Sequence, residues 1–503
     1  MEILAGMSDA FTLSTILYVF IGVFLGIAVG CVPGLGPNLA IPVCIPLTYF
    51  MSPIAAIGFL VGINKGGMYG GSISAILINT PGDVAAVATT FDGYPMAQKG
   101  QGFKALKTAL FSSCFGDTFS TLLVILVASK LATWALKMGA VEVLSVLILA
   151  LVLIAGLEAE SLIKGIISAA LGLLIATVGM EPTTAMPRFT FGFYRLENGF
   201  SVITLAIGML AVAELIRQCL DKENFGKIIK FKADGNVDKE KNRFSGRDAL
   251  HLLPTWLRSS CIGAFIGACP GLGSSVAAFL SYGIAKKAGG PCANFGKGEM
   301  RGIAAPETAN NAVVGAALIP LFTLGIPGSV AASLLIGAFI SQGITPGPLM
   351  FEEHARDVYG IYGSIIIGSI ACLFLGLLSN KLFVKVLEIP KIIMYPIILF
   401  ICIMGTYATN NDAVDVYLMS FMAIVGLLFK ISGFSFVTMI IGFVLGNQFE
   451  LSLQQTVIMS DGNLLILFQR PISCVMMIIT IAFIIWNTWT TYFRRKECPP
   501  PAE

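Results

Sequence analysis

The chain has 503 residues, of which 56% are hydrophobic and only 12% are charged, and its mean hydropathy is +0.85. Because about a quarter of the residues in soluble domains are charged, this composition excludes a water-soluble fold and predicts a polytopic membrane protein. The net charge of +3 does not indicate an acidic or a basic partner.

Nine apolar stretches approach or exceed the ~20 residues that cross a ~30 Å hydrocarbon core. In chain order they lie at residues 11–31, 105–128, 139–156, 162–180, 198–217, 302–324, 357–378, 413–429 and 470–491. They are apolar all round and do not alternate with a period of two, so we expect helices and not a barrel. Together with shorter apolar pieces, they predict an all-α membrane protein with about 10–12 transmembrane helices. The first stretch lacks a basic flank and is long enough to span, so we do not expect a cleavable signal peptide.

Basic residues are distributed unevenly along the chain. No Lys or Arg precedes Lys65, whereas eight lie between Asp221 and Asp248, and three more, at 494–496, follow the last apolar stretch. Cytoplasmic loops collect Lys and Arg. We therefore expect the basic segment and the C-terminus in the cytoplasm and the N-terminus in the periplasm. Acidic residues are interspersed in the segment and no aromatic platform accompanies it, so it does not predict binding to nucleic acid.

Two sequence patterns each occur twice. "GCVPGLG" at 30–36 matches "GACPGLG" at 267–273, and "NTPGDVAA" at 79–86 matches "GIPGSVAA" at 325–332. The chain thus divides into a first membrane half (residues 1–220), a basic cytoplasmic linker (221–249) and a second membrane half with the C-terminal spans (250–503). If the first half starts outside and the second starts after a cytoplasmic loop, the two repeats have inverted topology.

Each half contains two helix breaks in apolar surroundings. A break exposes backbone donors and acceptors that lipid cannot satisfy, so it persists only where protein or a water-filled cavity covers it. Paired discontinuous helices or re-entrant hairpins in two halves are typical of secondary-transporter sites. We interpret the two Pro-Gly-Leu-Gly motifs as two walls of one transport site. The nearby Gly22, Gly26 and Gly30 have the small-xxx-small spacing of close helix packing, which is the simpler interpretation for them.

Four blocks of the sequence resemble the large membrane subunit of the tripartite tricarboxylate transporters, the TctA family. They are "GCVPGLGPNLAIPVCIPLTY", "GGMYGGSISAILINTPGDVAAVATTFDGYPMAQKG", "GIAAPETANNAVVGAALIPLFTLGIPGSVAA" and "QGITPGPLMF". The resemblance implies a multi-pass permease in the inner membrane of a Gram-negative bacterium, working with a small membrane subunit and a periplasmic solute-binding protein. It implies import of a di- or tricarboxylate, or a related organic anion, by cation symport, usually with sodium, through alternating access. The resemblance leaves open whether the permease is a homodimer.

The breaks and the resemblance together predict the substrate site. Its expected residues are Gly34, Gly36, Tyr69, Gly70, Gly71, Ser72, Gly271, Gly273, Ser274, Pro327 and Gly328. Lys65 joins them, because a fixed positive charge in an apolar stretch suits an organic anion. Alternatively, Lys65 neutralises Glu307 or Asp83. The resemblance leads us to expect an apolar or aromatic residue at Lys65, which leaves open a substrate other than citrate.

The ion site is predicted from amide side chains. Asn64 and Asn310 occupy corresponding places in the two repeats, and with Asn311 they are candidates for binding sodium, the one cofactor expected. Neutral amide oxygens suit a hard monovalent cation, especially beside unwound backbone carbonyls. We expect Glu307 to serve coupling or structure, and Asp83 to cap the helix after the Pro81 break.

Other functions stay as alternatives. The segment at 289–298 is only a near miss of a phosphate-binding loop, which disfavours an ATP-driven permease without excluding an ATPase on another chain. A membrane-embedded enzyme lacks support, because no H-E-x-x-H or G-x-S-x-G motif occurs. A channel is harder to exclude, since broken helices also build filters.

Overall fold

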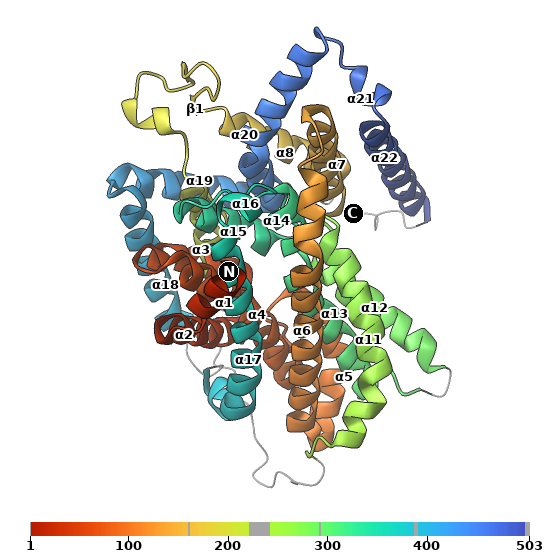
Figure 1. Ribbon diagram of the computed structural model, residues 1–503. Helices are drawn as coiled ribbons and strands as arrows, with labels where there is room; N and C mark the ends of the chain where they lie inside the picture. The colour runs from red at the N-terminus through yellow and green to blue at the C-terminus, as the bar shows by residue number, and fades with distance from the viewer. Residues whose placement is uncertain (1, 159–160, 221–241, 291–292, 387–390, 498–503) are drawn as a thin grey trace.

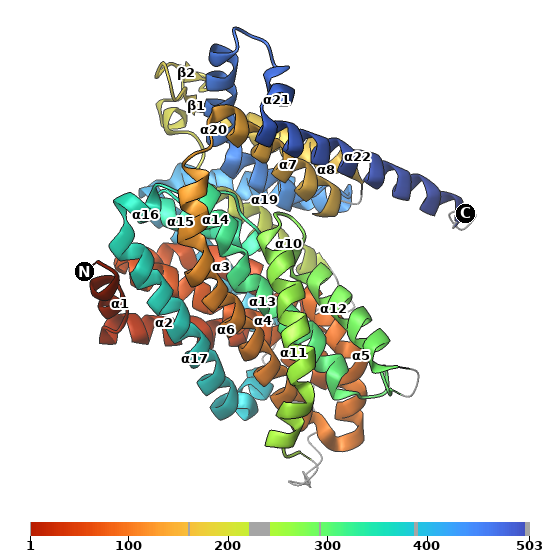
Figure 2. The same cartoon turned by 45° about the vertical axis from the view of Figure 1, so that its right-hand side comes forward.

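The computed structural model describes residues 2–158, 161–220, 242–290, 293–386 and 391–497. These residues are almost wholly helical, and their one sheet is the antiparallel pair β1 (Gly179–Met180) and β2 (Pro187–Arg188). The predicted all-α polytopic class is therefore confirmed. Figures 1 and 2 show a tall bundle of steep helices, with α7, α8, α20 and α22 gathered toward the end that carries the β-hairpin.

The helices of the first half include short 3-10 and π segments, which are labelled η. In chain order they are α1 (Glu2–Ala10), α2 (Leu13–Gly30), α3 (Pro37–Cys44), η1 (Ile45–Phe50), α4 (Pro53–Ile78), η2 (Val84–Ala86), α5 (Val87–Met96), η3 (Ala97–Gln101), α6 (Gly102–Ala135), α7 (Ala140–Glu158), α8 (Leu162–Ala176), η4 (Tyr194–Asn198), α9 (Val202–Ala206), η5 (Ile207–Val212) and α10 (Ala213–Leu220).

The described elements of the second half are all helices, joined by turns and loops. Its elements are α11 (Gly246–Ala268), α12 (Gly273–Gly289), α13 (Met300–Ala316), α14 (Leu318–Leu324), α15 (Val330–Ser341), α16 (Met350–Glu353), α17 (Ala355–Val386), α18 (Lys391–Asn410), α19 (Ala413–Ile431), α20 (Phe436–Met459), α21 (Ile466–Gln469) and α22 (Pro471–Glu497). α11 begins inside the range predicted as linker, and residues 221–241 of that linker lie outside the described residues.

Nine helical segments in the described part of the chain are long and apolar enough to cross a membrane, and three shorter apolar helices accompany them. Two of the nine, Ile392–Asn410 and Phe436–Met459, lie outside the stretches predicted from the sequence. The predicted stretch at 302–324 is not among them, because it divides into α13 and α14 and buries polar side chains inside the protein.

Glycines allow α2 and α4 to pack backbone against backbone. A Cβ built on Gly22 would lie 2.2 Å from the carbonyl oxygen of Phe59, and one on Gly66 would lie 2.3 Å from that of Val23. Any larger residue would separate the helices. The packing interpretation of the small-xxx-small glycines is therefore confirmed.

The two halves interlock through their long helices. α4 packs on α2 of its own half and on α17 of the other, while α13 packs on α11 of its own half and on α6 of the other. Figure 1 shows the long α6 running through the middle and lower part of the molecule beside α11 and α13. α4 and α13, which lie before the second break of their respective halves, thus each pack against helices of both halves.

Asp92 of α5 ties the loop before α13 to the first half. Its carboxylate accepts hydrogen bonds from the backbone N–H groups of Gly296, Gly298 and Glu299 at 2.8 to 2.9 Å, and from the Tyr282 hydroxyl at 2.9 Å. These four donors satisfy a fully buried carboxylate.

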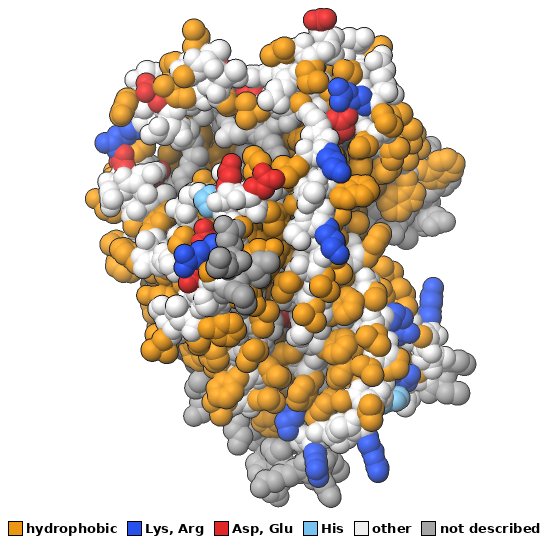
Figure 3. All heavy atoms as spheres, viewed as in Figure 1, with side chains coloured by type: hydrophobic (Ala, Val, Ile, Leu, Met, Phe, Trp, Pro, Cys, Tyr) orange, Lys and Arg blue, Asp and Glu red, His pale blue; other side chains and the backbone are white. Residues whose placement is uncertain are grey.

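Basic side chains gather at the end of the molecule where α11 begins (Figure 3). There the Lys104 ammonium lies 3.2 Å from Asp248, and Lys99 donates to the carbonyl of Lys297 at 2.5 Å. The hydrogen bonds at Ser245 and the Lys104 ammonium lower the pKa of Asp248 against the effect of burial. This end continues into the basic linker predicted to be cytoplasmic.

Candidate functional site

The first Pro-Gly-Leu-Gly motif interrupts the chain between α2 and α3. α2 ends at Gly30, and α3 begins at Pro37, whose fixed φ suits the first turn of a helix. Between them Gly34 has a φ of +81°, a conformation that glycine adopts without steric cost. The predicted break is therefore present, and its backbone is not paired in a continuous helix.

The second break of the first half lies directly against the first. Asn79, with a left-handed φ of 55°, ends α4. Asp83 then caps the next helical turn by accepting a hydrogen bond from the backbone N–H of Ala85 at 3.1 Å, as the sequence predicts. A Cβ on Gly82 would lie only 2.0 Å from the carbonyl oxygen of Gly30. Glycine is required here because the two broken backbones touch.

The second half has the same local geometry at matching positions. Gly271 has a φ of +87°, Gly325 has a φ of +70° and ends α14, and the Ser329 side chain caps α15. A Cβ on Gly328 would lie 2.5 Å from the carbonyl oxygen of Gly267, as Gly82 lies against Gly30. The backbone at the breaks therefore follows the predicted register, while the repeat of the whole halves stays a prediction.

A cavity of about 360 Å³ opens where the two breaks of the first half meet. Its lining combines residues of both breaks with residues of α3, η5, α10, α19 and α20. They are Gly34, Gly36, Asn38, Leu39, Pro81, Gly82, Asp83, Val84, Val87, Leu210, Glu214, Arg217, Lys430 and Phe436. Of the residues singled out from the sequence, Gly34, Gly36 and Asp83 line this cavity.

Three charged residues on one wall of this cavity were not predicted from the sequence. The Arg217 guanidinium lies 2.6 Å from the Glu214 carboxylate, which also pairs with the Lys430 ammonium. Gln218 donates to the carbonyl of Gly34 at 3.0 Å and so attaches this cluster to the first break. Arg217 and Lys430 share the Glu214 carboxylate, and the cavity lining as a whole contains these two cations together with the carboxylates of Glu214 and Asp83. The spacing of Glu214, Arg217 and Gln218 on one helical face was the available signal.

The second Pro-Gly-Leu-Gly motif does not line this cavity, which differs from the expectation that both motifs wall it. A Cβ on Gly271 would lie 2.7 Å from the Cα of Ile154, and one on Gly273 would lie 3.2 Å from the Glu158 carboxylate, so the motif packs on α7. Ser274 lies in the first turn of α12, which contacts η2 just after Asp83. The buried Pro327 and Gly328 lie outside the lining as well.

Lys65 is fully buried and is paired with Asp117, not with Glu307 or Asp83 as the sequence suggested. Its ammonium lies 2.8 Å from the Asp117 carboxylate and donates to the Ser369 hydroxyl at 2.7 Å and to the carbonyl of Ile365 at 3.0 Å. Glu307 and Asp83 find other partners because hydroxyl and backbone donors surround them. Lys65 does not line the 360 Å³ cavity.

The other α4 residues predicted for the site have different surroundings. Tyr69 is buried in an apolar cluster, and a Cβ on Gly70 would lie 2.5 Å from the carbonyl oxygen of Ile27, so both face the protein interior. Gly71 faces the second break, since its Cβ would lie 3.2 Å from the backbone nitrogen of Asp83. Ser72 donates to Glu307 at 2.5 Å.

Asn64 and Asn310 are buried, and neither side-chain oxygen has a hydrogen-bond partner among the described residues. Asn64 lies seven residues before Gly71, on the face of α4 that meets the second break. Asn311 differs, because its amide donates to the carbonyl of Glu307 at 3.0 Å. Unpartnered buried acceptors are costly without a ligand, which favours Asn64 and Asn310 over Asn311 as ion ligands.

Comparison of the sequence with known proteins identifies its family. The sequence model of the tripartite tricarboxylate transporter TctA family matches residues 16–441. The chain belongs to this family. The "Uncharacterized 52.8 kDa protein in TAR-I ttuC' 3'region" of Agrobacterium vitis is 36% identical over 480 residues, which are 95% of this chain and 94% of the relative. A second Agrobacterium vitis protein, named for the TAR-II ttuC' 3'region, is 37% identical over 211 residues, which are 42% of this chain and 87% of the relative. No solved structure matches.

This TctA-family protein is therefore a multi-pass membrane transporter subunit. The matched range contains the breaks and every residue that lines the 360 Å³ cavity, and it ends before α22.

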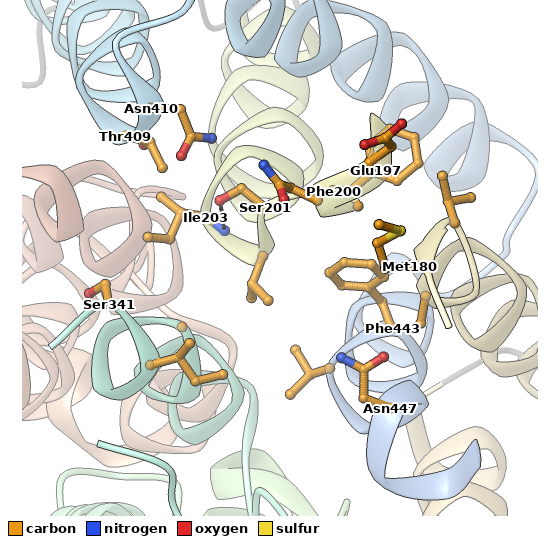
Figure 4. Close-up of a pocket in the computed structure, with 18 of the residues that line it drawn as sticks. Met180, Glu197, Phe200, Ser201, Ile203, Ser341, Thr409, Asn410, Phe443 and Asn447 are labelled. Carbon is orange, nitrogen blue, oxygen red and sulfur yellow. Dashed lines mark hydrogen bonds between the residues drawn. The ribbon is translucent and has the colours of Figure 1, made fainter. Parts of the chain in front are cut away.

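A second, larger cavity of about 630 Å³ lies toward the end that carries the β-hairpin (Figure 4). Its polar lining includes Ser201, Ser341, Asn410 and Asn447, with Glu197 as the charged side chain. No Lys or Arg lines it among the described residues. It lacks the broken backbone and the cations of the smaller cavity, so it is the weaker candidate for binding an anion.

Proposed function

We propose that this chain is the permease subunit of a binding-protein-dependent secondary transporter that imports a di- or tricarboxylate, or a related organic anion, by sodium symport. The observation that carries the proposal is the cavity at the two touching breaks, where Arg217 and Lys430 face unwound backbone. Cationic partners and helix breaks both favour the binding of a carboxylate, and this cavity has two cations beside the two breaks of the first half.

The cavity suits an anion of a few carbons. Its volume of about 360 Å³ is near the lower end of the ~300–1,000 Å³ range of small-molecule sites. Glu214 holds the two cations in place before substrate arrives, and a substrate carboxylate takes over part of this pairing. The site therefore binds anions without leaving the two cations unpaired when it is empty.

The other parts of the proposal follow from the family. The chain works in the bacterial inner membrane with a small membrane subunit and a periplasmic solute-binding protein, and alternating access moves the substrate past the breaks. Asn64 and Asn310 contribute their unpartnered oxygens to binding sodium. Uptake is expected to require a sodium gradient and no ATP, and it is expected to show saturation and counterflow, which a channel does not.

Removing one cation from the cavity tests the substrate site. We expect Arg217→Gln to raise the substrate concentration for half-maximal uptake about 10- to 100-fold, since a hydrogen bond to a charged group contributes roughly 1.5–3 kcal/mol. The measurement is initial uptake in proteoliposomes that contain both membrane subunits and the loaded binding protein, with sodium and substrate varied independently.

Arg356→Gln is the matched control, because Arg356 pairs with Asp9 on the surface, far from the cavity lining. Normal uptake by Arg217→Gln and Lys430→Gln would contradict the proposed substrate site. Uptake that needs ATP and no ion gradient would contradict secondary transport itself.

A further inference from the structure

The carboxylate of Glu307 lies in a cage of three hydroxyl groups. Ser72 of α4 donates to one oxygen at 2.5 Å, Thr89 of α5 contacts the same oxygen, and Ser113 of α6 donates to the other at 2.9 Å. Glu307 itself lies on α13 of the second half. Four helices from both halves therefore converge on this one carboxylate.

The cage holds a buried carboxyl group that has no basic partner among the described residues. Glu307, Ser72 and Thr89 are each 0% exposed. Among the described residues, no Lys, Arg or His forms an ion pair with Glu307, and Lys65 is already paired with Asp117. An isolated buried carboxylate is costly, so this site favours the binding of one positive charge.

The oxygens around Glu307 match a hard monovalent cation. All the side-chain groups that contact the carboxylate are hydroxyls, and a hydroxyl oxygen that donates its hydrogen keeps lone pairs that can bind a cation. Hard cations prefer oxygen ligands. A single carboxylate balances the charge of one monovalent cation.

We propose that Glu307, Ser72, Thr89 and Ser113 bind one sodium ion, at a site separate from Asn64 and Asn310. The ion would join α4, α5 and α6 of the first half to α13 of the second. Its role as a coupling ion rests on the function proposed above, whereas the binding itself does not. Ser72 follows Gly71, which faces the second break, so the cage adjoins this break through neighbouring residues of α4.

Direct sodium binding tests the proposal without substrate, partner subunits or transport. The purified full chain in nanodiscs is titrated with ²²Na⁺ alone, at constant ionic strength kept with choline chloride. We expect saturable binding by the wild type. Two sodium ions are expected per chain, one at the cage and one at Asn64 and Asn310, so Glu307→Gln should remove one of the two binding steps and leave the other. The step at the cage should weaken at least tenfold, because the isosteric amide keeps the volume and removes the charge. Ser113→Ala and Thr89→Val should each weaken it severalfold.

Ser74→Ala is the matched control, since Ser74 is equally buried on α4 but donates to the carbonyl of Gly71 within its own helix. It should bind sodium like the wild type. If Glu307→Gln does not elute as a folded species, Ser113→Ala and Thr89→Val decide the result. The proposal is overturned if the wild type shows no saturable binding, or if folded cage variants bind sodium normally. If the wild type binds sodium at the cage but shows no sodium-driven uptake, that result would count against the proposed function and not against this site.

Discussion

At the scale of single residues, Lys65 shows how the membrane interior holds a charge. Its ammonium is 1% exposed and is surrounded by Asp117, Ser369 and the carbonyl of Ile365. Two ions buried together cost less than either alone, because each replaces part of the other's lost hydration. The pair therefore depends on both members, and its position away from the cavity favours a structural role over a role in substrate binding.

Replacing one member of the ion pair should lower the stability of the protein more than replacing both members. We expect Lys65→Met to destabilise the protein by about 3–5 kcal/mol, because it leaves Asp117 charged and uncompensated. The double variant Lys65→Met with Asp117→Asn should recover much of that loss. The measurement is the midpoint of thermal unfolding in detergent, followed by the folded fraction in size-exclusion chromatography.

This experiment also separates the two roles expected for Lys65 from the sequence. If Lys65→Met folds normally and only weakens substrate binding, then Lys65 meets the substrate in another state of the transport cycle. If the double variant recovers stability and transports normally, the pair is structural.

The sequence indicated some residue roles and missed others for physical reasons. Asp83 was predictable as a cap because its role is local and needs only the residues that follow it. The partner of Lys65 was not, since Asp117 lies 52 residues away and only the packing of α6 on α4 brings it near. Arg217 and Lys430 resembled ordinary basic flanks of membrane spans until α10 and α19 placed them at the break.

At the scale of elements, the two breaks of the first half form one unit. The end of α2 and the loop before η2 touch at Gly30 and Gly82 without intervening side chains. Each break covers the exposed backbone of the other, which a break facing lipid could not do. The composition of the sequence predicted the breaks, because Pro and Gly interrupt helices locally, but not their contact.

Adding a single methyl group at Gly82 should separate the two breaks. In Gly82→Ala the new Cβ would lie 2.0 Å from the Gly30 carbonyl oxygen and 2.8 Å from the Cα of Gly71, both backbone atoms. We expect a loss of about 3 kcal/mol or more in stability, together with loss of uptake. Thermal unfolding and proteoliposome uptake measure the two effects.

Gly283→Ala in α12 is the comparison, because no atom lies within 4 Å of its added Cβ. It should be neutral or slightly stabilising. Equal behaviour of the two variants would show that the breaks separate easily and that their contact is not required.

At the scale of the whole molecule, the distribution of basic residues and the position of the β-hairpin distinguish two ends. The turn between α5 and α6, the start of α11 and the loop before α13 share the basic end, joined by Lys104 with Asp248 and by Lys99 with the carbonyl of Lys297. The β-hairpin and the 630 Å³ cavity lie toward the other end (Figures 1 and 4). The positive-inside rule therefore predicts that the hairpin end faces the periplasm.

Site-specific labelling tests this orientation. In a background without native cysteines, a membrane-impermeant maleimide should label Phe191→Cys in intact spheroplasts, because Phe191 is 81% exposed on the hairpin. Lys99→Cys should be labelled only after the membrane is permeabilised. The reverse pattern would invert the topology and place the larger cavity in the cytoplasm.

The interlocking of the halves also sets an order of events during synthesis. Asp117 follows Lys65 by 52 residues, but Ser369 follows it by 304, and Glu307 follows Ser72 by 235. At roughly 5–20 residues per second, the last groups emerge about 10–60 s after the first. The nascent first half thus waits in the bilayer with its ion pair formed early but with its hydroxyl cage lacking the carboxylate.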